Sequence, residues 1–388
     1  MKRMKKIIIF PGYYIPHIGG LETHVDEFVK HLSKDENFEI YVFAPNIPEA
    51  EEFEIRYNKV KVYRYPAFEI IPNYPVPNIF NLKFWKMFLN LYKIDFDIVM
   101  TRTRFFSNTL LGFIFAKLRL KRKKLIHVEH GSAFVKVENK LVNKIAYLYD
   151  MVIGRLIFNK ADYVIAISEA VREFIKNFTD REVPVIYRGL EIEEIEKIKE
   201  DEEIKERFKD KIKLCFVGRL YKWKGVENII KAYKLFPKEL REKVVLIIVG
   251  YGEDLERLKR LSGEYLNNGI YFLGKQPFER AIAIIKSCDI YIHSSYPGGG
   301  LSSSLLQAMA CGKAIVASPH EGAKEVIVNG VNGILLKDNT PESLKEGIVY
   351  LIENRDKWDL FGENCKKLIR EKFSWDKNIE RYKNILGR

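Results

Sequence analysis

The stretch that decides the fold is IYIHSSYPGGGLSSSLLQAMACG, residues 290–312. It opens with the apolar run Ile290–His293, which predicts a short buried strand. A glycine loop follows, and a helix is expected to begin near Ser302 or Ser303, where a serine hydroxyl can cap the first turn. A strand that enters a helix through such a loop is the building unit of a parallel sheet covered by helices.

The same unit repeats along the chain. Helical stretches such as 21–32, 226–234 and 341–352 alternate with short apolar runs, most of them continuous rather than strictly alternating. Continuous runs are typical of parallel strands that have both faces covered. We therefore predict an α/β protein built of doubly wound, Rossmann-like sheets. Further strands are expected at Lys6–Phe10, Glu39–Phe43, Val60–Tyr63, Ile98–Thr101, Lys124–His130, Tyr163–Ile167, Val183–Tyr187, Leu214–Val217, Val244–Val249, Ile270–Leu273, Ala314–Ala317 and Gly333–Leu335.

Chain length and a restart of this pattern predict two domains. The 388 residues correspond to two or three domains of about 150 residues each. An acidic, lysine-rich helix is expected over Ile192–Phe208, and a new series of strands opens at Leu214. We expect an N-terminal domain over residues 1–188 and a C-terminal domain over residues 189–372. Because doubly wound sheets bind ligands at the carboxyl ends of their strands, the expected site is a central cleft that the two domains face.

The composition narrows the class of partner. With 47% apolar and 30% charged residues, the chain is neither disordered nor of low complexity. Much of the net charge of +13 lies in residues 101–160, which hold 13 basic and three acidic residues. The basic run Lys117–Lys124 has little aromatic interleaving, so no nucleic acid is expected as a partner. The apolar residues before it favour docking of 105–124 on an anionic membrane surface, with a packed helix as the alternative.

The expected location is cytoplasmic, peripheral on the inner face of the membrane. No apolar run reaches the roughly 20 residues of a spanning helix. The apolar run in MKRMKKIIIFPG, residues 1–12, is too short for a signal peptide. The four cysteines are far apart and are expected to be reduced core residues: Cys215, Cys288, Cys311 and Cys365.

Three loops carry groups suited to an anion. In PGYYIPHIGG, residues 11–20, Gly19 and Gly20 precede a helix whose first N–H groups suit a phosphate. The loop does not read GxGxxG, so a nicotinamide cofactor is unsupported. In FVGRLYKWKG, residues 216–225, Gly218 turns the chain and two cations follow. An arginine can hold a diphosphate with two parallel hydrogen bonds, and a lysine acts as a point charge.

The third loop is the glycine run of residues 298–300, which would cradle an anion at the start of the next helix. For each of these loops a purely structural alternative stays open. Glycines can simply form a turn, and arginines and lysines are common on surfaces.

Acid–base candidates follow other strands. In HVEHGS, residues 127–132, His130 is expected at the end of the strand, while His127 points to the opposite face and is expected in the core. Glu129 and, in HEGAKEVIVNGVNG, Glu325 are possible site residues. Asp95-Phe96-Asp97 precedes a strand, whereas a metal site would need the far end of that strand, so no metal is expected.

These loops, in this order, resemble the retaining GT-B glycosyltransferases of family 4, also called glycosyl transferases group 1. The resemblance runs nearly from end to end of the chain. The closing FSW, residues 373–375, is similar to the segment before a terminal helix, 373–388, that packs back on the first domain. The motifs that carry it are PHIGGLETHV, EHG, ADYVIAISEAVREF, GRLYKWKG, VGYGEDLERLK, LGKQP, LLQAMACGKAIVAS and NGVNGILL.

The resemblance implies a metal-independent transfer with retention from a nucleotide-diphosphate sugar to a glycan or polyprenyl-linked acceptor. The sugar nucleotide is then a substrate, and no cofactor is implied. His130 would lie beside the transferred sugar, and Arg219 and Lys224 would bind the pyrophosphate and stabilise the leaving group. The implied donor contacts are Gly19, Gly20, Gly218, Leu273, Gly274, Gly300, Leu301 and Ser302.

Two departures from the family pattern concern the donor. The family has two glutamates eight positions apart, and this chain has Gly299 and Gln307 there. The Gln307 amide can still hydrogen-bond a ribose, but Gly299 offers no side chain for the sugar. Arg188 replaces a usual asparagine and adds a cation that could touch a phosphate. Two alternatives stay open: a non-catalytic sugar-nucleotide or glycan-binding protein that acts with a partner, and a GT-B sugar-nucleotide epimerase or disaccharide synthase.

Overall fold

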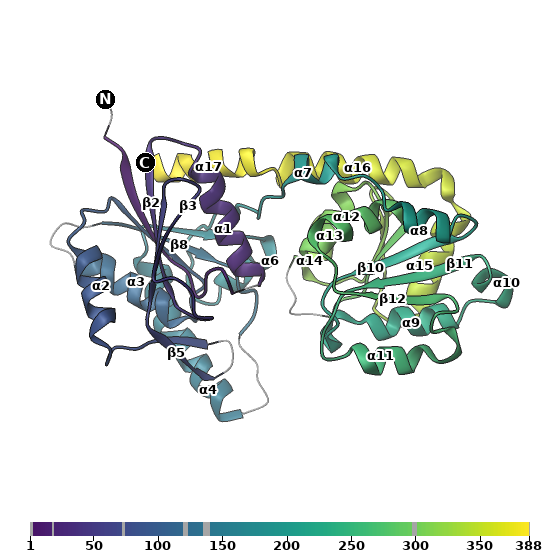
Figure 1. Ribbon diagram of the computed structural model, residues 1–388, viewed down its shortest axis with the longest axis horizontal. Coiled ribbons are helices and arrows are strands. Elements are labelled where there is room, and N and C mark those ends of the chain that lie inside the picture. Colours follow the sequence, from purple (N-terminus) through teal and green to yellow (C-terminus); the bar gives the residue numbers. More distant parts are fainter. Residues whose placement is uncertain are drawn as a thin grey trace. The chain divides into compact units, whose positions relative to one another are not determined.

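The computed structural model describes residues 3–17, 19–71, 74–118, 123–134, 140–296 and 301–387. The chain forms two compact units, which are described one at a time (Figure 1). Unit 1 comprises residues 1–189 and 375–388, and unit 2 comprises residues 190–374. The sequence placed the first division between 188 and 189 and the start of the returning helix near 373.

Unit 1 contains a seven-stranded sheet in the order β3-β4-β2-β1-β7-β8-β9. Its strands are parallel, except that the edge strand β3 runs antiparallel to β4. The strands are β1 Lys5–Phe10, β2 Phe38–Pro45, β3 Phe53–Arg56, β4 Val60–Tyr65, β7 Ile98–Arg102, β8 Lys124–Glu129 and β9 Tyr163–Ala166; β5 Ala67–Ile71 and β6 Tyr74–Pro77 form a separate hairpin.

Helices cover both faces of this sheet. Successive residues of β1 alternate between two cores: Ile7 and Ile9 belong to one, Ile8 and Phe10 to the other. This burial on both faces explains why the strand reads as a continuous apolar run. The helices are α1 Gly20–Leu32, α2 Leu82–Tyr92, α3 Ser107–Lys117, α4 Lys140–Tyr149, α5 Arg155–Lys160, α6 Glu169–Ile175 and α17 Trp375–Gly387.

The last helix, α17, belongs to unit 1 although it comes from the end of the chain. It packs beside α1, and the yellow and purple ribbons lie together in Figure 1. Tyr382 and Leu386 are fully buried, and the Phe28 and Tyr382 rings meet edge to face at 4.8 Å. The Lys5 ammonium donates a hydrogen bond to the carbonyl of Leu386 at 2.9 Å.

Unit 2 contains a six-stranded parallel sheet in the order β12-β11-β10-β13-β14-β15. The strands are β10 Ile212–Val217, β11 Val244–Val249, β12 Ile270–Gly274, β13 Ile290–His293, β14 Ala314–Ala317 and β15 Ile334–Leu335. The helices are α7 Ile192–Lys197, α8 Glu202–Arg207, α9 Val226–Lys234, α10 Lys238–Arg241, α11 Leu255–Ser262, α12 Phe278–Ser287, α13 Ser303–Ala310, α14 Glu321–Val326, α15 Pro341–Glu353 and α16 Trp358–Lys372. The predicted α/β class with two Rossmann-like sheets is confirmed.

Two local expectations are wrong. Residues 183–187 form no strand, because only Val185 pairs with β9, through a single bridge to Ala166. The helix expected over Ile192–Phe208 is interrupted, because the Asp201 carboxylate accepts a hydrogen bond from the Ile204 N–H and starts α8 as a new helix.

The apolar run at residues 105–116 is partly buried in unit 1, and Ile114 stays 38% exposed. It forms α3, which packs against β1, β6 and β7, with Phe106 and Phe115 buried. Two lysines of the basic run are also engaged: Lys123 pairs with Asp95, and Lys124 donates to the carbonyl of Ile385. Residues 119–122 lie outside the described residues. Among the described helices, none is long and apolar enough to cross a bilayer.

Candidate functional site

The strand order of unit 2 reverses between β10 and β13, so the loops after these two neighbouring strands meet at the carboxyl edge of the sheet. Such a reversal is where doubly wound sheets bind ligands. The loop after β10 is tied to the loop after β13: the Ser294 hydroxyl donates to the Lys224 carbonyl at 2.8 Å, and the Tyr296 N–H donates to the Trp223 carbonyl. Sequence-predicted residues from both loops are thus brought together.

The Lys224 ammonium has an unusual electrostatic environment, because it is largely desolvated and lies near a second cation. This ammonium lies 4.2 Å from the centre of the Trp223 ring. Burial and then the nearby charge of Arg219 lower the pKa of Lys224 to about 8. No carboxylate of a described residue forms an ion pair with Lys224. A desolvated lysine beside a second cation is electrostatically suited to an anion.

Arg219 adds positive charge beside Lys224, whereas the neighbouring His293 is neutral at pH 7. Arg219 is exposed, with its guanidinium 5.8 Å from the Tyr221 ring. His293, at the end of β13, is 4% exposed, and burial, then Lys224, lower the pKa of His293 to about 3. His293 was not singled out from the sequence, although it directly precedes the glycine loop.

The helix after the glycine loop, α13, begins beside β10. A side chain built on Gly218 would approach the Phe216 ring to 3.2 Å and the Ser304 hydroxyl to 4.0 Å. Ser302 is 7% exposed, and its hydroxyl lies 3.1 Å from that of Ser304. Leu301 and Gln307 are half-buried before and within α13. Gly299 and Gly300 lie outside the described residues.

Three other predicted positions of unit 2 lie at the end of β12 and in α14. Gly274, at the end of β12, has a φ of +68°, and no atom of the described residues lies within 4 Å of an added Cβ. The carbonyl of Leu273 accepts a hydrogen bond from the Gln276 amide at 2.6 Å. Glu325 lies half-buried in α14, the helix that follows β14.

In unit 1 the predicted His130 directly follows β8. Its ring centre is 5.0 Å from that of His24 on α1, and its buried Nε2 has no hydrogen-bond partner among the residues that the structure describes. Burial, followed by the charge of Arg102, lowers the pKa of His130 well below its usual value. The side chain is therefore neutral at pH 7. His127 is fully buried, as expected, and its Nδ1 lies 2.9 Å from the Thr101 hydroxyl.

Glu129 is a support for this loop and is not open to a ligand. Its carboxylate is fully buried and accepts hydrogen bonds from the backbone N–H groups of Arg104, His130 and Gly131. It also contacts His127 Nε2 at 3.1 Å and the Arg104 guanidinium at 3.3 Å. The possible substrate role of Glu129 is thus unsupported, because every neighbour it binds is part of the fold.

Two arginines of this region were missed in the sequence. Arg102 and Arg104, in TRTR at the end of β7, are both fully buried. Arg104 also pairs with Asp150 at 2.9 Å, whereas the Arg102 guanidinium lies between the rings of Phe28, at 4.5 Å, and Tyr382, at 6.0 Å. Their place at the carboxyl end of a predicted strand could have marked these two arginines as candidate site residues.

The glycine pair of unit 1 stands at the start of α1. Gly19 is the N-cap, and a Cβ added to it would come within 2.4 Å of a Glu22 carboxylate oxygen. Glu22 in turn lies 3.0 Å from His17 Nδ1. Gly20 has nothing within 4 Å of an added Cβ. One guanidinium nitrogen of Arg188, Nη2, donates hydrogen bonds to both carboxylate oxygens of Glu27, at 3.1 Å and 3.2 Å.

The described residues contain no group of three or more His, Cys, Asp or Glu side chains that could hold a metal ion. The Asp97 carboxylate accepts a hydrogen bond from the backbone N–H of Lys6 at 2.8 Å, and Asp95 pairs with Lys123. All four cysteines are free thiols.

Comparisons with known proteins agree with this architecture. Residues 18–194 match the family model Glycosyltransferase Family 4, and residues 197–368 match Glycosyl transferases group 1. A relative in Methanocaldococcus jannaschii, the uncharacterized glycosyltransferase MJ1069, is 74% identical over 388 residues, which covers 100% of this chain and 99% of the relative.

A more distant relative is the N,N'-diacetylbacillosaminyl-diphospho-undecaprenol alpha-1,3-N-acetylgalactosaminyltransferase of Campylobacter jejuni, 27% identical over 97% of this chain and 98% of the relative. Among solved structures, sucrose-phosphate synthase from Thermosynechococcus elongatus has a TM-score of 0.76 at 15% identity, covering 99% of this chain and 98% of that one. Two matching family models, one for each half of the chain, and a full-length relative at 74% identity lead to one conclusion: the chain is a GT-B glycosyltransferase of group 1.

Proposed function

We propose that this glycosyltransferase transfers a hexose-type sugar from a nucleotide-diphosphate sugar to a glycan or lipid-linked acceptor, with retention and without a metal ion. The observation that carries the donor class is Lys224. Its half-buried ammonium has no carboxylate partner among the described residues and lies in the electrostatic field of Arg219. A diphosphate would supply a negatively charged partner for Lys224 and could be held by Arg219 with two parallel hydrogen bonds.

The chemistry follows from where charge develops. Cleavage of the sugar–phosphate bond places negative charge on the departing nucleoside diphosphate. Lys224 and Arg219 stabilise that charge more in the transition state than in the ground state, which is what accelerates a reaction. A bound diphosphate also favours the protonated form of Lys224, so that it stays an ammonium during transfer. The neutral His130 ring is suited to a hydrogen bond with a sugar hydroxyl, and retention is proposed from the family pattern.

The test is release of nucleoside diphosphate with a panel of nucleotide sugars and acceptors. We expect Lys224→Ala and Arg219→Ala each to lower turnover at least tenfold, which corresponds to about 1.4 kcal/mol of lost transition-state stabilisation. Lys222→Ala is the matched control, since Lys222 is an exposed lysine of the same turn, and its turnover should stay close to that of the wild type. Near-wild-type rates in both site variants would contradict the assignment.

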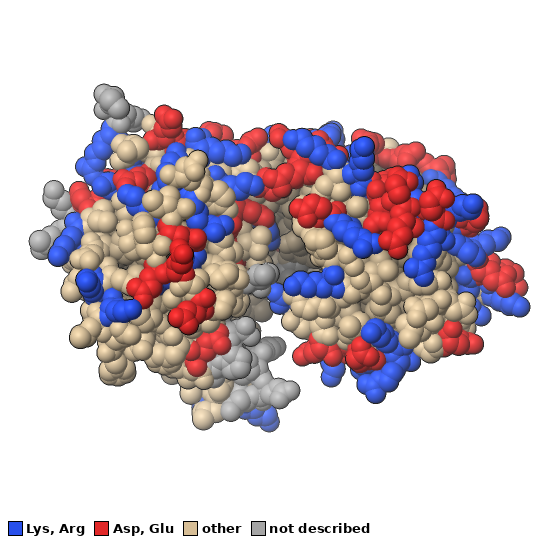
Figure 2. All heavy atoms as spheres, in the orientation of Figure 1, with Lys and Arg blue, Asp and Glu red and all other residues tan. Residues whose placement is uncertain are grey.

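The acceptor proposal rests on relatives and on a surface of unit 1. Two Campylobacter jejuni relatives, 27% and 26% identical, are named as acting on diphospho-undecaprenol-linked sugars. A polyprenyl-linked acceptor lies at a membrane. On and just before α2, Phe80 and Leu82 are 88% and 84% exposed, and the same helix carries Lys83 and Lys86 but no acidic residue. Figure 2 shows broad uncharged areas with single lysines over α2.

We propose that this exposed face of α2 docks on an anionic membrane surface. Apolar side chains flanked by lysines gain both burial in the headgroup region and attraction to anionic lipid. In a sedimentation assay with phosphatidylglycerol vesicles at low salt, Phe80→Ser combined with Leu82→Ser should reduce the bound fraction at least threefold. Leu360→Ser is the control, because Leu360 is 60% exposed on α16 of unit 2. Equal loss in the control, or no loss in either protein, would refute docking by α2.

A further inference from the structure

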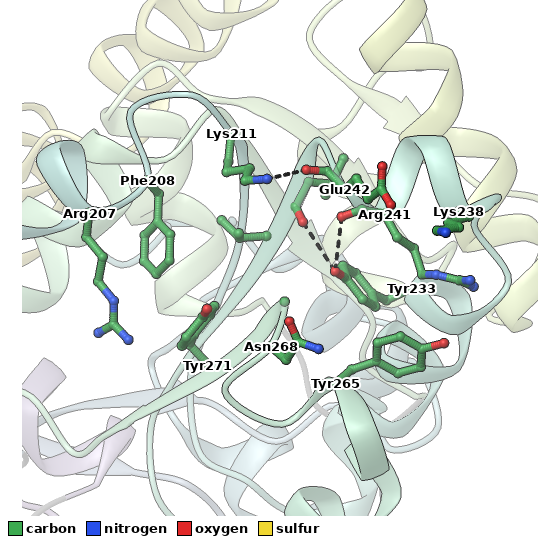
Figure 3. A pocket seen from close by; sticks show the side chains of 13 residues that line it. Arg207, Phe208, Lys211, Tyr233, Lys238, Arg241, Glu242, Tyr265, Asn268 and Tyr271 are labelled. Carbon is green, nitrogen blue, oxygen red and sulfur yellow. Dashed lines mark hydrogen bonds between the residues drawn. The ribbon is translucent and has the colours of Figure 1, made fainter.

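A pocket of unit 2 lies at the opposite edge of its sheet from Gly218 and Gly274. It has a volume of about 580 Å³ and is formed where β10, β11 and β12 begin. Figure 3 shows its labelled side chains arranged around these strand starts, with Asn268 between Tyr271 and Tyr265. Pockets of about 300–1,000 Å³ are of the size that holds small molecules. None of the residues predicted from the sequence lines this pocket.

The pocket is rich in positive charge. Its lining includes one carboxylate, that of Glu242, and four cationic side chains: Arg207, Lys211, Lys238 and Arg241. Within the described part of the chain, none of these four forms an ion pair with a carboxylate. Lys211 donates to the backbone carbonyl of Glu242, and Arg241 donates to two backbone carbonyls at 2.8 Å and 3.0 Å.

Other arginines of unit 2 behave differently. Arg257 contacts the carboxylates of Asp254 and Glu227, and Arg280 contacts those of Asp201 and Glu203. The positive charge of the pocket is therefore not a general property of the surface of unit 2, and it is available for an anionic ligand.

Aromatic rings hold the two arginines of the pocket in place. The guanidinium of Arg207 lies 4.7 Å from the Tyr271 ring centre, and that of Arg241 lies 5.2 Å from the Tyr265 ring centre. Stacking of this kind orients the planar donor fork without neutralising it. Tyr265 and Tyr271 are half-buried, so each ring still presents part of its surface to the pocket.

The floor of the pocket is fixed, and its mouth is polar. The Tyr233 hydroxyl donates to the Val244 carbonyl at 3.2 Å, which turns this polar atom away from a ligand. Gly269 leaves room for Tyr233, because a Cβ on residue 269 would come within 2.1 Å of the Tyr233 hydroxyl. Asn268 is exposed at the mouth, with an amide that can both donate to and accept from hydroxyl groups.

We propose that this pocket binds an anionic saccharide, a sugar unit that carries a phosphate or carboxylate group. Lys238 and Arg241, which lie three residues apart on α10, hold the acidic group, the Tyr265 ring beside Arg241 covers an apolar face of the sugar, and Asn268 bonds its hydroxyls. The pocket is a glycan-binding site of unit 2 in addition to the proposed donor site, and it does not depend on that site. Its residues lie at the amino ends of the strands whose carboxyl ends carry Gly218 and Gly274.

The test measures dissociation constants of the full-length protein by calorimetry and ligand-observed NMR. The probes are glucose 1-phosphate, glucuronate, glucose, inorganic phosphate and uridine monophosphate, and the first two distinguish phosphate from carboxylate. Lys238→Gln should weaken binding of at least one anionic sugar, and Lys238→Gln combined with Arg241→Gln should weaken it about tenfold or more, because charge-assisted hydrogen bonds are lost. Arg355→Gln is the matched control, since this exposed arginine lies 5.7 Å from the Trp358 ring outside the pocket.

Further variants separate this site from the donor site. Lys224→Ala should leave binding of the anionic sugar in place, whereas Tyr265→Ala should weaken it more than it weakens binding of inorganic phosphate. Loss of binding in Lys224→Ala with none in Lys238→Gln would assign the sugar to the donor loop and overturn the proposal. Equal affinities for phosphate and sugar phosphate, or tighter binding of uridine monophosphate that depends on Lys238, would overturn it as well.

Discussion

Replacing Glu129 by glutamine tests the buried support of the loop that carries His130. The fully buried Glu129 carboxylate accepts hydrogen bonds from three backbone N–H groups and contacts the Arg104 guanidinium. Glutamine has nearly the same shape but no charge, and its NH₂ group would face donors rather than acceptors. Arg104 would keep only the Asp150 carboxylate as an ionic partner.

The expected loss of stability can be worked out from the carboxyl group. Although burial alone would raise it, the Arg104 charge and the hydrogen bonds hold the pKa of Glu129 at about 2, against 4.5 for the free group. This difference corresponds to about 3 kcal/mol of stabilisation of the folded state at neutral pH. Removing one partner of a buried ion pair costs a similar 3–5 kcal/mol or so. The stabilisation is present above pH 4.5 and is lost as the pH falls toward 2.

The assay is urea denaturation at pH 7 and at pH 3, followed by tryptophan fluorescence. Trp223 and Trp358 of unit 2 are first replaced by phenylalanine, so that the signal reports on unit 1. We expect Glu129→Gln to lower the free energy of unfolding by about 3 kcal/mol at pH 7 and by less at pH 3. The control is Glu49→Gln, an exposed glutamate of the same unit. A loss below about 1 kcal/mol at pH 7, the size of an ordinary substitution, would refute the reasoning.

Two further predictions concern Lys224 and Gly189. The kcat/KM for nucleoside diphosphate release, measured at donor concentrations well below KM, should decline as the pH rises through about 8, because Lys224 of the free enzyme then loses its proton, and Lys224→Arg should remove this decline. A steady rate up to pH 10 in the wild type would contradict it. Gly189→Ala should destabilise unit 1 by about 1–3 kcal/mol, because the new methyl group would lie 2.2 Å from the Trp375 ring. Gly387→Ala, where nothing lies within 4 Å, should leave the melting temperature unchanged.

The sequence located strands best where burial on both faces left a continuous apolar run. The run Val244–Val249 is predicted with its observed bounds, because all six residues are buried. The edge strand β3, Phe53–Arg56, alternates between exposed and half-buried residues and is set by pairing with β4, so its short run carried no signal.

The candidate site was predictable as far as loops follow strands. Arg219 and Lys224 follow β10, and His130 follows β8, as expected. Burial of charged side chains is decided by packing between distant elements, and this is why Arg102 was missed. The same limit applies to Glu129, whose motif resembled a substrate contact while its neighbours turn it into a support.

The return of α17 to unit 1 has a consequence for the order of folding during synthesis. Residues 190–374 form a complete unit and are all made before the ribosome reaches Trp375. Unit 1 is begun first but closes last, because Tyr382 and Leu386 fill the core beside α1. Until then Val25, Phe28 and Val29 of that core lack part of their cover. A fragment ending at residue 189 should therefore be prone to aggregate, and adding residues 375–388 as a separate peptide should rescue it.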